Sequence, residues 1–125
     1  MSLSRAVLSF GMLIVAFDAV WATIASVGGY DYQALGWVSF ILWGLAAFVA
    51  ARATTIPLGI VAGTLVAAID ATIGWAVSML IGPGIPKVPL TASLVIFTVI
   101  FVIVMGAVIA TVGALLSRLP VFRRS

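Results

Sequence analysis

Four long apolar segments divide the chain, and short breaks rich in turn residues separate them. A helix needs roughly 20 apolar residues to cross a bilayer core. The first break is led by Gly28-Gly29, and the last, 82–89, contains three prolines that interrupt a helix. The apolar runs are continuous rather than alternating, which disfavours a lipid-facing barrel. We therefore predict an all-α integral membrane protein with four transmembrane helices, at about residues 6–27, 34–51, 57–81 and 90–116.

The composition places residues 1–125 in a single membrane domain. Hydrophobic residues make up 65% of the chain and charged residues only 7%, whereas soluble domains carry about 25% charged residues. The expected partner of this surface is the lipid bilayer. The few basic residues are scattered, so no nucleic-acid partner is expected. The first segment is longer than the apolar core of a signal peptide and contains Asp18, which favours a retained helix over a cleaved leader.

The basic residues predict the orientation. With four spans, only Lys87 falls on one side of the membrane, and all the arginines fall on the other. An excess of Lys and Arg marks the cytoplasmic side. We therefore expect both termini in the cytoplasm and the protein in the cell membrane. The arginines are Arg5, Arg52, Arg118, Arg123 and Arg124.

Residue types that support catalysis are scarce. The chain contains no Cys and no His, and its three acidic residues are all Asp. No nucleophile–base pair and no metal-binding cluster can be recognised. We expect neither an enzyme nor a bound metal or cofactor.

Two carboxylates inside the predicted spans are the strongest functional signal. Asp18 and Asp70 lie at similar depths, because each follows the cytoplasmic start of its helix by a similar distance. An acidic side chain there costs at least about 2.5 kcal/mol, so such residues usually face a bundle interior or a wet cavity. One interpretation is a proton- or cation-binding site. The other is structural, with each carboxyl bonded to a hydroxyl on Thr23, Ser26, Thr72 or Ser78.

A shift of 52 positions aligns the first span with the third. The six aligned pairs are Gly11 with Gly63, Leu13 with Leu65, Ala16 with Ala68, Asp18 with Asp70, Ala19 with Ala71, and Ser26 with Ser78. The pattern is typical of a parallel repeat of two hairpins, although chance agreement is an alternative in a chain rich in Ala and Gly. Small residues predict close helix packing at Gly59, Gly63, Ala67, Gly74, Gly106, Ala110 and Gly113.

Aromatic residues gather in the outer half of the predicted bundle. Trp37, Tyr30 and Tyr32 fit an interfacial belt, as do Trp21 and Trp75 on the simpler interpretation. Trp21 and Trp75 also follow the two aspartates by about one turn, and carboxylates beside indoles suit a lipophilic cation. On that interpretation Trp21, Trp75, Ser26 and Ser78 line a pathway. Trp43 falls deeper and is expected to pack between helices.

These features favour two classes of function. The first is a small transporter or channel-like protein in which Asp18 and Asp70 bind a proton or cation. The second is a non-catalytic subunit or assembly factor of a larger membrane complex, which the near absence of soluble loops favours. We expect either a homo-oligomer, because four short helices rarely enclose a pathway alone, or a place in a larger membrane complex.

Overall fold

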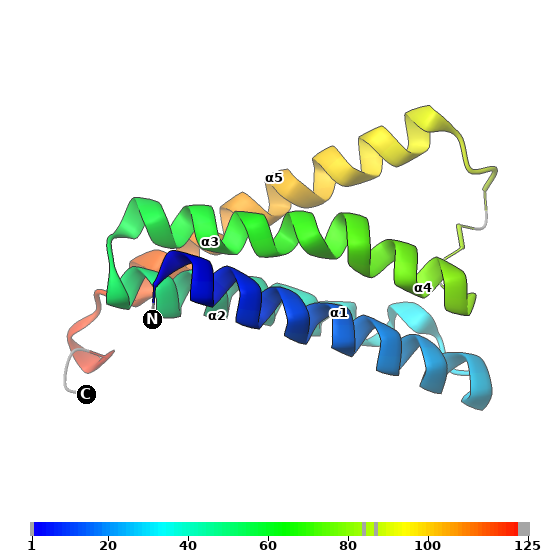
Figure 1. The fold of residues 1–125 in the computed structure, drawn as a ribbon, viewed down its shortest axis with the longest axis horizontal. Coiled ribbons are helices and arrows are strands. Elements are labelled where there is room, and N and C mark those ends of the chain that lie inside the picture. Colours follow the sequence, from blue (N-terminus) through cyan, green and yellow to red (C-terminus); the bar gives the residue numbers. More distant parts are fainter. Residues whose placement is uncertain (1, 84, 87, 123–125) are drawn as a thin grey trace.

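The computed structural model describes residues 2–83, 85, 86 and 88–122, and within these ranges the chain is helical with no strand. Consecutive long helices run in opposite directions (Figure 1). The elements in chain order are α1 (Leu3–Gly28), the 3-10 turn η1 (Tyr32–Leu35), α2 (Gly36–Ala53), α3 (Ile56–Ile69), the π-helical turn η2 (Asp70–Gly74), α4 (Trp75–Ile81), α5 (Ala92–Leu116) and the 3-10 turn η3 (Pro120–Phe122).

Four helical rods are long and apolar enough to cross a membrane. They comprise α1, η1 with α2, α3 through α4, and α5, and their mean hydropathies are 2.0, 2.0, 1.9 and 2.9. The prediction of an all-α chain with four candidate spans is confirmed for the described residues. Their number and apolarity indicate a multi-pass membrane protein.

Hydroxyl side chains cap the N-termini of α1, α3 and α5. Ser2 accepts a hydrogen bond from the Arg5 backbone N–H at α1, and Thr91 accepts one from Leu94 at α5. Thr55 caps α3 by accepting a hydrogen bond from the Leu58 backbone N–H, and Pro57 lies in the first turn. These caps satisfy backbone donors that have no partner within the helix.

Close packing of small residues joins α2, α3 and α5. A Cβ atom added to Gly63 would lie 2.6 Å from the Ala110 Cβ and 2.9 Å from the Ala47 Cβ. A Cβ added to Gly106 would collide with Ala67, and one added to Gly113 with the Gly44 carbonyl oxygen. All seven positions proposed for helix packing are buried. In lipid, this close approach of backbones supplies the van der Waals contact that holds helices together.

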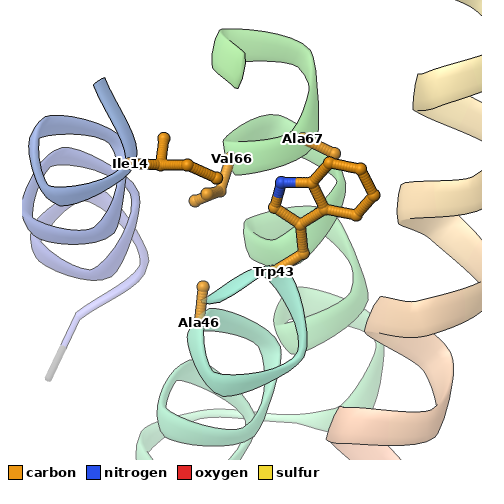
Figure 2. Packing of buried hydrophobic residues seen from close by; sticks show 5 residues of the cluster. All are labelled: Ile14, Trp43, Ala46, Val66 and Ala67. Atoms are coloured by element: carbon orange, nitrogen blue, oxygen red, sulfur yellow. The ribbon is translucent and has the colours of Figure 1, made fainter. Parts of the chain in front are cut away.

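Trp43 lies in a buried cluster at the centre of the bundle. Its indole reaches from α2 to Ala67 of α3, and Val66 of α3 meets Ile14 of α1 beside it (Figure 2). Only 3% of Trp43 is exposed. The expectation that this tryptophan packs between helices is confirmed.

The first half of α5 diverges from the other helices (Figure 1). Phe97 and Phe101 stack on its outer face and are exposed. The close contacts of α5 lie in its second half, at Gly106, Ala110 and Gly113. The bundle is therefore tightly closed near Ser2 and Phe122, and more open at the opposite end, called here the distal end, which carries η1 and the connection from α4 to α5.

Candidate functional site

Asp18 of α1 and Asp70 of η2 lie side by side in the bundle. Each is a hydrogen-bonding neighbour of the other. Oxygen atoms of both carboxyls also lie close to Gly74, where the Cβ atom of another residue type would be. A Cβ added there would collide with Asp18 Oδ2 and would lie 2.9 Å from Asp70 Oδ1. Two carboxyl groups this close repel each other when both are ionised, which favours a proton or a cation between them.

The π-helical turn η2 positions this pair. It interrupts the rod between α3 and α4 over Asp70–Gly74, so Asp70 and Gly74 both face Asp18. Turns of this kind are rare and frequently occur at functional sites. Because Gly74 has no side chain, the Asp18 carboxyl can lie directly against its backbone.

Helix α2 contributes the polar neighbours of Asp70. The Ser39 hydroxyl and the Trp43 indole N–H both lie beside its carboxyl. Trp43 Nε1 nevertheless has no partner with ordinary hydrogen-bond geometry, and Asp18 Oδ2 has none either. The site thus contains a donor and an acceptor that are buried, close to the pair and not committed to another group.

A crevice of about 280 Å³ contains the pair and is bounded by α1, η1, α2, η2, α4 and the diverging half of α5. Two aspartates and a serine supply its deep polar groups, and the rest of the wall is mostly aromatic and aliphatic. The lining residues are Phe17, Asp18, Trp21, Tyr32, Gln33, Leu35, Gly36, Ser39, Phe40, Trp43, Asp70, Ala71, Trp75, Thr98 and Val102.

A second hollow of about 700 Å³ adjoins the crevice at the distal end. Tyr32, Gln33, Trp75 and Thr98 line both spaces. The hollow extends to the proline-containing connection after α4. The two spaces together form an approach to the aspartates from the distal end.

Hydrogen bonds and ring stacking hold the aromatic wall in place. Trp21 Nε1 donates to the Tyr32 carbonyl oxygen at 2.7 Å, which ties α1 to η1. Trp21 also stacks on Tyr30, with ring centroids 6.2 Å apart. Within α2, Phe40 packs against Trp43, with ring centroids 5.2 Å apart. The wall is therefore built from residues of α1, η1 and α2 that fix one another.

The predicted pathway residues divide into two groups. Trp21 and Trp75 line the crevice. Ser78 is not among the lining residues: it is fully buried, donates to the Trp75 carbonyl oxygen at 2.8 Å and neighbours Tyr32. Ser26 is exposed on α1 and lies outside the crevice. The two serines that the repeat aligns therefore have different surroundings.

Three of the four hydroxyls that the structural interpretation assigned to the carboxyls, those of Thr23, Thr72 and Ser78, bond to backbone carbonyl oxygens instead. Thr23 donates to the Ala19 carbonyl oxygen, and Thr72 donates to the Ala68 carbonyl oxygen, each within its own helix. Apart from Asp18, the polar neighbours of Asp70 come instead from α2, as Ser39 and Trp43. Ser39 carries the one signal that was available, because it is the only hydroxyl side chain between Gln33 and Arg52.

The charge balance of the crevice is acidic. Its lining contains Asp18 and Asp70 and, among the described residues, no Lys or Arg. An acidic lining of this kind favours a positively charged ligand over an anion. Compared with protein-family models, with curated proteins and with solved structures, the chain matches none.

Proposed function

We propose that this multi-pass protein is a small transporter or channel-like protein in which Asp18 and Asp70 bind a proton or a cation. One observation carries the proposal: two carboxyls from different helices meet at the base of a crevice that is approached from the distal end. Acidic residues within a membrane bundle commonly mark proton and ion pathways. The role is one of binding and passage, not of catalysis.

The absence of a nearby compensating charge supports this role. No basic side chain of the described residues lines the crevice. A buried carboxylate without a counter-ion is strongly unfavourable, so the pair needs either a proton or an external cation. Exchange of one for the other at the same pair is the elementary step of proton-coupled transport.

The distribution of arginines supports an orientation with the crevice facing outward. Arg5, Arg52 and Arg118 all lie at the end of the bundle opposite the distal end. Lys87, Arg123 and Arg124, which also entered the sequence prediction, lie outside the described residues. By the positive-inside rule, both termini face the cytoplasm and the protein resides in the cell membrane.

Passage across the membrane also needs an exit. On the side of the aspartates away from the distal end, Gly63 lies in close contact with Ala47 and Ala110, and the bundle is closed there. A route to the other side therefore requires these helices to separate, or requires a second copy of the chain to complete the path. We propose a homo-oligomer, with lipid or a neighbouring subunit covering the exposed face of α5.

The proposal is tested with purified protein in liposomes that contain a pH-sensitive dye. An imposed ion gradient should drive proton flux through the wild-type protein. Asp18→Asn and Asp70→Asn each remove one ionisable group at constant size and should reduce flux at least about tenfold, which corresponds to about 1.4 kcal/mol. Thr23→Val and Thr64→Val are matched controls, because both hydroxyls bond only to their own helix.

Full flux in both Asn variants would refute the proposed role of the pair. Absence of flux in the wild-type protein would contradict transport and favour a non-catalytic subunit or assembly factor of a larger membrane complex. Native mass spectrometry of protein extracted gently from its own membrane then separates the two classes. A stoichiometric set of other chains identifies a subunit of a larger complex, and a homo-oligomer supports transport.

A further inference from the structure

The wall of the crevice is unusually aromatic for a site built around two carboxyls. Phe17, Trp21, Tyr32, Phe40, Trp43 and Trp75 all line it. An interfacial belt accounts for rings on the outer surface, such as Trp37, which is 55% exposed. Trp43, in contrast, is 3% exposed, packs between the helices and also lines the crevice. Aromatic faces attract cations at desolvated sites.

An inorganic cation fits this site poorly. Small hard cations require about six oxygen ligands in place of their water shell. Near the pair, the wall supplies the two carboxyls and the Ser39 hydroxyl, and most of the remaining surface is carbon. Tyr32, Gln33 and Thr98 lie toward the mouth, where the crevice joins the distal hollow. A dehydrated metal ion would therefore remain undercoordinated at the aspartates.

The size of the crevice selects a compact ligand. Its volume of about 280 Å³ lies just below the range of roughly 300–1,000 Å³ that is usual for pockets binding drug-sized molecules. An ammonium ion with a few short alkyl groups suits such a space, with its charge facing the carboxyls and its alkyl groups against the rings. The distal hollow is larger, at about 700 Å³.

Two unpartnered polar atoms indicate how the site responds when the shared proton leaves. Asp18 is 6% exposed and Trp43 is 3% exposed, and both line the crevice. Neither Asp18 Oδ2 nor Trp43 Nε1 has a hydrogen-bond partner. Once both carboxyls are ionised, the Trp43 N–H and the Ser39 hydroxyl can donate to Asp70, and Asp18 is left to face the incoming positive charge.

Resting on the proposed function, we infer that the ligand of this crevice is a compact organic cation of the alkylammonium class, which displaces the proton shared by Asp18 and Asp70. One cation enters from the distal end and one proton leaves to water by the same route. The net charge of the occupied site is unchanged by this exchange. The aromatic wall selects against hydrated inorganic ions, and the carboxyl pair selects against neutral molecules.

The test uses the full-length protein in detergent and tetraethylammonium as the probe. Tryptophan fluorescence is titrated at constant ionic strength, with tetraethylammonium chloride replacing sodium chloride. Calorimetry in two buffers of different ionisation enthalpy counts the protons released. We expect saturable quenching, about one proton released per bound cation, and affinity at least about tenfold weaker in Asp18→Asn and Trp21→Leu. Trp37→Phe, outside the crevice, should bind normally.

The outcomes distinguish this inference from the proposed function. If proton flux depends on the aspartates but tetraethylammonium does not bind, the organic ligand is wrong and the transport role remains. If tetraethylammonium binds in the wild type and not in Asp18→Asn, but no flux occurs, the ligand stands and transport is wrong. If sodium chloride or potassium chloride quenched the fluorescence as strongly as tetraethylammonium chloride, the inference would also be wrong. Thermal melting of each variant confirms that a loss of binding is not a loss of fold.

Discussion

The backbone of Gly74 lies directly against the Asp18 carboxyl, and the absence of a side chain there leaves room for the two aspartates to lie side by side. A side chain at residue 74 would occupy the position that Asp18 Oδ2 holds in the structure. Gly74 ends the π-helical turn that begins with Asp70, so the same short segment supplies one carboxyl and the space for the other. At the residue scale, the site depends on a missing Cβ atom as much as on its charged groups.

We predict that Gly74→Ala lowers the stability of the fold and impairs the site. Forcing a methyl group into a packed position typically costs about 1–3 kcal/mol, and here it must also displace the Asp18 carboxyl. Thermal unfolding in detergent and cation binding provide the two readouts. Gly44→Ala is the matched control, because its added Cβ would meet only Ile109 at 3.5 Å, an ordinary contact. Equal behaviour of the two variants would contradict the assigned role of Gly74.

Helix α5 is held at one end and diverges at the other. Its second half packs on α2 and α3 through Gly106, Ala110 and Gly113. Just beyond its end, Arg118 donates to the Ala51 carbonyl oxygen at 2.8 Å and to the Thr54 carbonyl oxygen at 3.2 Å. These carbonyls belong to the end of α2, where a cation also interacts favourably with the helix dipole. At the element scale, the crevice exists because the close contacts of α5 with α2 and α3 lie in its second half, and its first half diverges at the distal end.

We predict that Arg118→Ala weakens the link between the end of α5 and the end of α2. A charged side chain that bonds two carbonyl oxygens contributes roughly 1–2 kcal/mol where it is partly exposed, so the melting temperature in detergent should fall. Arg5→Ala removes the same charge from an exposed position on α1 and should change the melting temperature much less. A similar decrease in both variants would mean that charge, and not the link from α5 to α2, determines the effect.

The molecule as a whole has a closed half and an open half. Tight contacts between small residues close the end that carries Arg5, Arg52 and Arg118, and the crevice opens toward the distal end. In the proposed orientation the open half faces outward. The aspartates would then sample ligand from the outside, and the small-residue packing of α2, α3 and α5 would form the barrier toward the cytoplasm.

Single cysteine residues test this orientation, because the natural chain contains no cysteine. Val88→Cys lies in the connection before α5, and Ser4→Cys lies at the start of α1, and both positions are exposed. A membrane-impermeant maleimide should label Val88→Cys in intact cells and Ser4→Cys only after permeabilisation. The reverse pattern would show that the crevice opens to the cytoplasm and that the arginine rule fails for this chain.

The sequence alone was sufficient for features that depend on local composition. Apolar runs of sufficient length identified the four candidate spans, because a bilayer imposes the same length requirement on every spanning helix. The start of α3 at Thr55 and Pro57 is also a local feature, since capping depends on neighbouring residues. The depth of Trp43 within its apolar run was enough to predict its burial. The parallel repeat stays a prediction.

Tertiary structure decided how these elements combine into a site. The sequence showed that Asp18 and Asp70 lie at similar depths, but their contact depends on how α1 is rotated against η2 and on the space beside Gly74. The π-helical turn has no local signature in the sequence. The neighbours Ser39 and Trp43 come from a third helix, which only packing brings to the aspartates. Hydropathy determines which segments cross the membrane, whereas side-chain shape determines which faces meet, and the site depends on those faces.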